Sequence, residues 1–183
     1  MLYLMRHGKT SWNINRRYQG NTDIPLCDEG ILQAKEAKEK YKDVHFDICY
    51  TSPLSRARKT AEIVLEGRDI QIITDERLRE MNFGEYEGRY VNKDDKDDPM
   101  TILFDSPEKF VPGIGGERLE DVIKRTGSFL EECVYPYKDR DILLIGHGAM
   151  FSGLYCSIFD IPVENYWQHF TKNCELVKVE YQV

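Results

Sequence analysis

Two histidines stand in the same sequence context, far apart in the chain. Arg6 and His7 follow the apolar stretch 2–5, and His147 follows the apolar stretch 142–145. Each stretch predicts a buried strand, and the glycines beside each histidine predict a tight turn. Ligands of open α/β folds bind outside the carboxyl ends of the strands. If the two strands are neighbours in one sheet, Arg6 and both imidazoles converge on one pocket at that edge.

Arg56 is expected at the same edge. The stretch 46–50 predicts another buried strand, and a helix over 54–65 follows it, with Ser52 as its cap and Pro53 at its first position. Arg56 then lies in the first turn, where the helix dipole favours anions. An arginine in that place makes most sense beside a bound anion, and the planar forks of two arginines suit phosphate or sulfate. The sequence therefore predicts a phosphate site.

These residue types predict covalent phosphoryl transfer. A neutral imidazole beside phosphorus can attack it and form a phosphohistidine that water later hydrolyses, without a metal or other cofactor. The leaving alcohol needs a proton, which a carboxylic acid can supply before its carboxylate activates water. The arginines and a protonated second histidine stabilise the charge on the phosphoryl oxygens. The acid itself stays open among four carboxylates of an active-site loop expected at 75–88, namely Glu76, Glu80, Glu85 and Glu87.

The rest of the pattern predicts a fold that can position these groups. Strands and helices alternate along the chain, which predicts a three-layer α/β/α sandwich with a mostly parallel sheet. The alternating stretch 175–181 predicts an antiparallel strand at one edge. Asp28 is expected to cap the helix that follows it. Further elements are expected as a strand at 71–74, helices at 29–41, 119–134 and 149–159, and a short helix within 100–110.

The composition limits the class of protein. The 183 residues carry a net charge of −7, which argues against a nucleic-acid partner because such a surface needs clustered Lys and Arg. No apolar run is long enough to span a membrane, so we expect a cytoplasmic protein. Five widely spaced cysteines without a C-x-x-C pair predict reduced thiols and no zinc site. We expect one domain over 1–183 with a variable cap at about 85–116, acting on a small molecule as a monomer or homodimer.

Four ordered motifs resemble those of the histidine phosphatase (phosphoglycerate mutase-like) superfamily. They are Leu4-Met5-Arg6-His7-Gly8-Lys9-Thr10 with Asn13, Thr51-Ser52-Pro53-Leu54-Ser55-Arg56-Ala57 with Thr60-Ala61, Leu78-Arg79-Glu80 with Phe83-Gly84, and Gly146-His147-Gly148. The resemblance implies that His7 is the phosphorylated nucleophile and that Glu80 is the proton donor and acceptor. It implies that phosphate and substrate are bound by Arg6, Asn13, Gln19, Gly20, Arg56, His147 and Gly148. Lys9 departs from the acidic residue common at its position, which concerns the rim of the pocket.

Within this superfamily the sequence favours a phosphatase. Residues 81–88 and the turn 112–117 resemble the alpha-ribazole phosphatase-like and broad-specificity members, whereas the mutases are longer. We expect a metal-independent phosphomonoesterase that hydrolyses a small phosphorylated metabolite, with alpha-ribazole 5'-phosphate as one candidate. A cofactor-dependent phosphoglycerate mutase is the alternative within the superfamily. A non-catalytic phospholigand-binding protein is the alternative of another class, although a pure binder has no need of an acid. The aromatic candidates for the substrate side are Trp12, Tyr18, Tyr86, Phe104 and Phe110.

Overall fold

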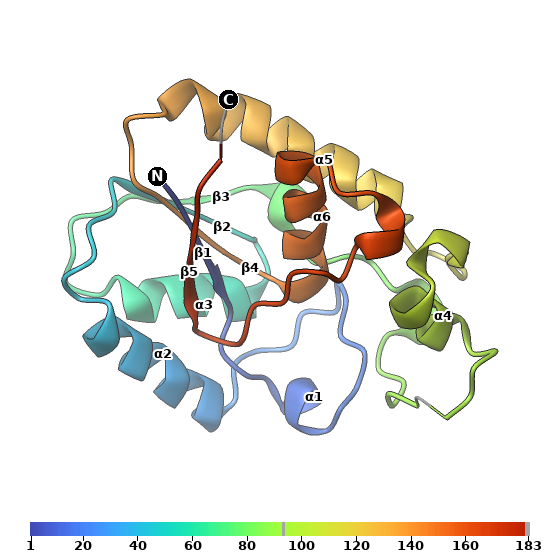
Figure 1. Ribbon diagram of the computed structural model, residues 1–183. Helices are drawn as coiled ribbons and strands as arrows, with labels where there is room; N and C mark the ends of the chain where they lie inside the picture. The colour runs from blue at the N-terminus through green and yellow to red at the C-terminus, as the bar shows by residue number, and fades with distance from the viewer. Residues whose placement is uncertain (93, 182–183) are drawn as a thin grey trace.

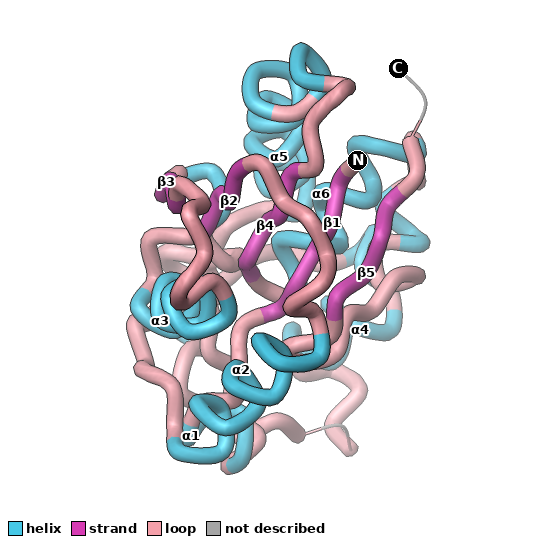
Figure 2. Tube along the Cα trace, turned by 90° about the vertical axis from the view of Figure 1, so that its left-hand side faces the viewer, coloured by secondary structure: helices cyan, strands magenta, loops and turns pink. Residues whose placement is uncertain are grey.

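The computed structural model describes residues 1–92 and 94–181 and shows an α/β fold built on one sheet (Figure 1). The described residues form five strands in the order β3-β2-β4-β1-β5, which Figure 2 shows side by side. All neighbouring strands are parallel except β5, which runs antiparallel to β1. The expected parallel sheet with an antiparallel edge strand is therefore confirmed. The strands are β1 (Leu2–Arg6), β2 (Ile48–Thr51), β3 (Ile72–Thr74), β4 (Ile142–Gly146) and β5 (Leu176–Val179).

Helices cover both faces of the sheet, as the alternating pattern predicts. The helices α2 (Asp28–Lys40) and α3 (Ser55–Val64) lie on one side, and α5 (Leu119–Cys133) and α6 (Gly148–Phe159) lie on the other (Figure 1). Strands covered on both faces are apolar throughout, and their side chains point alternately to the two layers.

The alternation is visible in β1. Leu2 and Leu4 pack in the core cluster that contains Phe129 of α5, whereas Met5 packs with Ala57 of α3. The central strands β1 and β4 are fully buried at their apolar positions, apart from the half-buried Tyr3. Because these two strands are held from both faces, the residues that follow them are held at fixed positions.

The start of α3 differs from the expectation. The helix begins at Ser55 after Leu54, so Pro53 is not its first residue and Ser52 is not its cap. The hydroxyl of Ser52 instead accepts the Leu54 N–H at 3.2 Å, and the carboxylate of Asp23 accepts the Ser55 N–H at 2.8 Å. A loop carboxylate thus supplies the partner that a capping side chain would otherwise supply.

Two other helices also begin at residues that differ from the expected ones. Cys27 precedes α2, so Asp28 lies inside the helix as an acidic residue of its first turn and is not the cap. The short helix expected within 100–110 begins at Pro99, because the side chain of Asp98 accepts the Met100 N–H at 2.8 Å. This helix is α4 (Pro99–Asp105).

A third core cluster supports the segment between β3 and α5. It packs Met81, Phe83 and Leu103 against Val122 of α5. None of the helices formed by the described residues is long and apolar enough to cross a membrane. The remaining helical segments are α1 (Ser11–Ile14) and the 3-10 turns η1 (Glu76–Leu78), η2 (Gly84–Tyr86), η3 (Pro107–Lys109), η4 (Tyr135–Tyr137) and η5 (Val163–Asn165).

Candidate active site

The two histidines expected to converge lie side by side. Strands β1 and β4 pair in parallel with Arg6 opposite Gly146, and the His7 N–H donates to the Gly146 carbonyl oxygen at 3.0 Å. The centroids of the His7 and His147 rings are 5.0 Å apart, and the ring planes are inclined by 59°. Both rings are buried. The convergence predicted from the two strand ends is therefore confirmed.

A cavity of about 450 Å³ opens beside His7. It gathers most of the residues expected to bind phosphate and substrate. His147 is fully buried beside His7 and is not part of the cavity lining. The expected residues that line the cavity are Arg6, His7, Asn13, Gln19, Gly20, Arg56, Glu80 and Gly148.

The ring of His7 is held in one tautomer. Its Nδ1 lies 2.7 Å from the carbonyl oxygen of Gly8, which can only accept, so Nδ1 carries the proton. The Nε2 atom then keeps its lone pair and accepts the Arg56 Nε–H at 3.3 Å. Burial, followed by the charges of Arg56 and Arg6, holds the pKa of His7 well below its usual range. His7 is therefore neutral at neutral pH, as a nucleophile must be.

Arg56 is buried and anchored by the loop that follows α1. Its Nη2 donates to the Gly20 carbonyl oxygen at 2.7 Å, and its Nη1 donates to the Thr22 carbonyl oxygen at 2.9 Å. Gly20 has a φ of +56°, a conformation that favours glycine and turns this carbonyl toward the arginine. Burial lowers the pKa of Arg56 to about 10, so the guanidinium stays charged at neutral pH.

Two polar amides complete this side of the cavity. With the Gln19 amide oxygen turned toward Arg56, it accepts the Arg56 Nε–H at 2.6 Å and shares this hydrogen with the His7 Nε2, while its nitrogen donates to the Thr10 hydroxyl. The Asn13 side-chain oxygen accepts the Thr10 N–H at 3.0 Å, and the Thr10 hydroxyl caps α1. Since the amide oxygen of Asn13 is occupied in this way, its Nδ2 group is the donor it can offer to a ligand.

Several buried polar nitrogens have no hydrogen-bond partner among the described residues. They are the Nε of Arg6, which is a donor, and the two ring nitrogens of His147, of which one donates and one accepts in the neutral ring. Burial, followed by the charge of Arg56, holds the pKa of His147 well below its usual range, so the ring is neutral at neutral pH, in contrast to the protonated second histidine expected from the sequence. Buried polar atoms without partners cost free energy, and one anion in the cavity beside them can satisfy several at once. The buried guanidinium groups and the unpaired nitrogens therefore favour an anionic ligand in this site.

The structure separates Glu80 from the other candidate acids. Glu80 is buried in the cavity wall, where its Oε1 accepts the N–H groups of Met81 and Met150, both at 2.8 Å. Its Oε2 accepts the Ala149 N–H at 3.2 Å, so two donors come from the first turn of α6. The other three carboxylates have structural contacts outside the cavity lining: Glu76 with Arg79, Glu85 with the Ile114 N–H, and Glu87 with the Asn21 and Thr22 N–H groups.

The C-terminal segment also contacts the end of β1. Asn173 donates from its side-chain Nδ2 to the His7 carbonyl oxygen at 2.5 Å, and the Cys174 N–H donates to the Arg6 carbonyl oxygen at 2.8 Å. Sequence reasoning missed both contacts. The only available signal was the apolar alternation of 175–181, which places a strand there but says nothing of the residues before it.

The aromatic side of the cavity differs in part from the expectation. Tyr18 and Phe104 line it, whereas Trp12, Tyr86 and Phe110 do not. The chain brings five unexpected residues to the lining instead: Arg17, Phe83, Ala149, Trp167 and Phe170. Lys9 is also absent from the lining, because its ammonium pairs with the Glu29 carboxylate at 2.5 Å on the surface. Lys9, which departs from the acidic residue common at its position, therefore does not contribute to the cavity.

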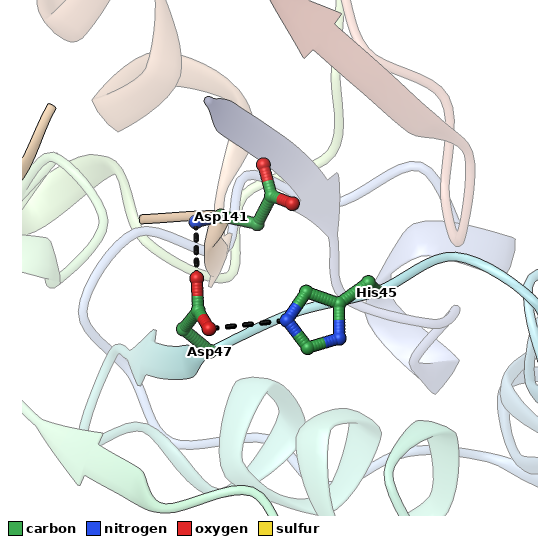
Figure 3. A group of neighbouring side chains, drawn as sticks. All are labelled: His45, Asp47 and Asp141. Carbon is green, nitrogen blue, oxygen red and sulfur yellow. Dashed lines mark hydrogen bonds and ion pairs between the residues drawn. The ribbon is translucent and has the colours of Figure 1, made fainter. Parts of the chain in front are cut away.

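One group of possible metal ligands exists among the described residues, and it lies away from the cavity. His45, Asp47 and Asp141 offer ligand atoms within 4.8 Å of one another, and Asp47 and Asp141 precede β2 and β4 (Figure 3). They therefore stand at the opposite end of the sheet from His7. Both Asp47 oxygens are already used: one pairs with the His45 ring at 3.0 Å, and the other accepts the Asp141 N–H at 2.6 Å. Exposed groups of this kind are common without an ion.

Comparisons with known proteins cover almost the whole chain. The family model described as "Histidine phosphatase superfamily (branch 1)" matches residues 2–183. A curated relative from Cronobacter sakazakii, named probable phosphoglycerate mutase GpmB, is 31% identical over 184 residues, which covers 99% of this chain and 85% of the relative.

Two solved structures are similar in fold as well as in sequence. Bacillus stearothermophilus YhfR has a TM-score of 0.87 and 32% identity, covering 98% of this chain and 91% of that one. The alpha-ribazole phosphatase from Shigella flexneri has a TM-score of 0.82 and 28% identity, covering 96% of this chain and 87% of that one. These likenesses extend over the strands and loops that carry the cavity residues described above.

Proposed function

Because the chain belongs to the histidine phosphatase superfamily (branch 1), we propose that it is a phosphomonoesterase with His7 as its nucleophile. One observation carries this proposal. A neutral imidazole, whose Nε2 lone pair meets only a 3.3 Å contact from the Arg56 Nε–H, lines a cavity beside buried Arg6 and His147 nitrogens that lack partners among the described residues. A phosphoryl group supplies acceptor oxygens for the N–H groups among these nitrogens and the electrophile that the lone pair needs.

In the first step, the Nε2 of His7 attacks phosphorus and the bond between phosphorus and the ester oxygen breaks. The hydrogen bond from Nδ1 to the Gly8 carbonyl oxygen fixes the ring and stabilises the positive charge that it gains. Arg6, Arg56 and His147 bind the equatorial oxygens, where charge collects in the transition state. Glu80 in its acid form gives its proton to the leaving alkoxide, which departs as the alcohol.

In the second step, water attacks the phosphohistidine. The Glu80 carboxylate takes the proton of this water, and the bond between phosphorus and Nε2 breaks to release inorganic phosphate. The Oε2 atom of Glu80 accepts only one backbone N–H, so it is the oxygen with room for this proton. The two steps return His7 and Glu80 to their starting states, and they use only groups of the protein.

We propose a small phosphorylated metabolite as the substrate, with alpha-ribazole 5'-phosphate as one candidate. The likeness to the Shigella flexneri alpha-ribazole phosphatase supports this choice. We also propose that residues 1–183 act as one catalytic domain in which the segment 85–116 caps the cavity. The placement of Phe104 of this segment in the cavity lining supports the capping role.

A phosphoglycerate mutase is the second candidate, because the Cronobacter sakazakii relative carries that name. A mutase and a phosphatase share the phosphohistidine and differ in the acceptor, which is a second hydroxyl group in one and water in the other. With 3-phosphoglycerate as the substrate, a mutase forms more 2-phosphoglycerate than inorganic phosphate. A phosphatase forms more inorganic phosphate.

The test measures phosphate release from a panel of small monoesters in the presence of a chelator. We expect turnover that persists in chelator and is lost in His7→Ala, together with acid-labile phosphate trapped on His7 after rapid quenching. Turnover abolished by chelation alone refutes the mechanism. Binding of phosphate esters without any turnover identifies a non-catalytic phospholigand-binding protein instead.

A further inference from the structure

Four aromatic rings form a continuous wall on one side of the cavity. The ring centroids of Tyr18 and Phe83 are 6.3 Å apart, those of Tyr18 and Phe104 are 6.2 Å apart at an angle of 16°, and those of Phe104 and Trp167 are 4.7 Å apart. All four rings line the cavity. They come from four separate segments of the chain, so the fold brings them together only at this place.

The wall is preformed, and apart from the Tyr18 hydroxyl its surface consists mainly of ring carbon. The indole Nε1 of Trp167 donates to the Leu103 carbonyl oxygen at 2.7 Å, which uses its polar atom and fixes the ring against α4. Tyr18 and Phe83 are buried members of the third core cluster. A ligand group that packs on this wall therefore meets mainly the carbon surface of rings that are already in place.

Phe170 stands at the mouth of the cavity with 72% of its surface exposed. Its ring centroid is 5.5 Å from the Arg6 guanidinium carbon, above the phosphate-binding residues. Exposure of an aromatic ring to water is unfavourable, so an apolar ligand group that covers the ring is stabilised there by the hydrophobic effect. Phe170 is thus placed to pack on the part of a ligand that extends outward from the phosphoryl group.

The outer cavity offers a second anionic group one cation, and that cation already has protein partners. Of the described residues that line it, Arg17 is the one cation besides Arg6 and Arg56. Its Nη1 donates to the Gly88 carbonyl oxygen at 2.9 Å, its Nη2 donates to the Tyr90 hydroxyl at 2.6 Å, and its guanidinium lies 4.1 Å from the Tyr90 ring centroid. These contacts use two of the five guanidinium N–H groups and hold Arg17 against Gly88 and Tyr90.

We propose that the site selects phosphomonoesters whose alcohol carries an aromatic ring over esters whose alcohol carries a carboxylate. The ring packs on Phe104 and Trp167, and Phe170 covers it. This selectivity rests on the proposed phosphatase function and goes beyond it by naming the substrate class. The cavity of about 450 Å³ is in the range of small-molecule sites, which combine apolar walls with a few polar groups.

The test compares primary alkyl phosphates, so that the leaving alcohols are similar in chemistry. The kcat/KM for 2-phenylethyl phosphate is expected to exceed that for 3-phosphoglycerate by about tenfold or more, the worth of one good aromatic contact. It is also expected to exceed the kcat/KM for 2-cyclohexylethyl phosphate, a ligand of similar size without a π system. Equal values for the phenyl and cyclohexyl esters overturn the aromatic part of the proposal.

Two variants test the residues. Phe170→Ala changes an exposed side chain and leaves the core intact, and Phe104→Ala removes a ring of the wall. Each is expected to lower the kcat/KM ratio of 2-phenylethyl phosphate to 3-phosphoglycerate several-fold. Tyr137→Ala, which removes an exposed aromatic ring outside the cavity lining, keeps the wild-type ratio.

Two further results distinguish failure of the proposed selectivity from failure of the proposed phosphatase function. If the kcat/KM for 3-phosphoglycerate equals that for 2-phenylethyl phosphate, the proposed selectivity is wrong while the phosphatase function stands. If no ester is hydrolysed, the phosphatase function itself is wrong. In His7→Ala that also carries Trp12→Phe, Trp167 is the remaining tryptophan, and a change in its emission on titration with 2-phenylethyl phosphate gives a readout that does not depend on turnover. Binding of the ester, measured by calorimetry, without any change in this emission overturns the packing on Trp167.

Discussion

The two buried histidines are expected to make the stability of the protein depend on pH between 7.5 and 5.5. The pKa values of His7 and His147 are held well below the usual range in the folded state, mainly by burial. The unfolded chain therefore binds more protons than the folded one as the pH falls through about 6.5, the ordinary histidine pKa. Stability is full above this value and is lost progressively below it, until the folded-state pKa values are reached.

The size of the effect follows from proton linkage. A histidine that has an unfolded pKa of about 6.5 and stays neutral in the folded state lowers the free energy of unfolding by about 1.4 kcal/mol between pH 7.5 and pH 5.5. His7 and His147 together cost about 2.7 kcal/mol if neither gains a proton in the folded protein. This is a large part of the roughly 5–15 kcal/mol by which proteins of this kind are stable.

The measurement is urea denaturation at several pH values in this window, which lies above the ordinary range of carboxyl titration. His7→Gln and His147→Gln are each expected to remove about half of the pH dependence, because each leaves one buried imidazole. His45→Gln, at an exposed position at the other end of the sheet, is the matched control and retains the wild-type slope. A wild-type stability that stays flat from pH 7.5 to 5.5, or an unchanged slope in His147→Gln, refutes the reasoning.

Three further substitutions test the site and the fold. Glu80→Gln is expected to lower kcat for alkyl esters by about 10²-fold to 10⁴-fold, with a smaller loss for p-nitrophenyl phosphate, whose leaving group needs no proton; equal losses contradict the acid role. Arg56→Lys is expected to lower kcat/KM by about 10²-fold, because a point charge replaces a planar fork that also holds the Gly20 and Thr22 carbonyls; a near wild-type value contradicts this. Gly8→Ala is expected to lower stability by about 1–3 kcal/mol in thermal unfolding, because a Cβ there meets the Gly30 backbone; an unchanged Tm contradicts the close packing.

The parts of the fold predicted best are those set by local patterns. The apolar stretches that end at His7 and His147 are strands β1 and β4, because strands covered on both faces must be apolar throughout. The convergence of the two rings needed one non-local fact, the pairing of these strands, which the sequence allowed without requiring. That pairing follows from burial of both strands in the middle of the sheet.

The features that the sequence did not predict depend on contacts between distant segments of the chain. The start of α3 depends on the Asp23 carboxylate, which lies 32 positions before Ser55 in the chain. The cavity wall depends on Trp167 and Phe170, whose segment carries no signal that links it to α4. Glu80 differs from its neighbours in the loop only by its place beside the first turn of α6, which no spacing rule conveys.

The position of β1 between β4 and β5 has a consequence for how the enzyme comes into being. During synthesis on the ribosome β1 emerges before both of its neighbours, since one lies about 140 residues later and the other is the final strand described. Pairings between such distant segments are slow to form, because a long loop must close before they contribute. The hydrogen bond from Asn173 to the His7 carbonyl oxygen also forms only at this late stage. A nascent chain therefore carries His7 long before the segments that fix its position, so the proposed activity is expected only after most of the chain has been made.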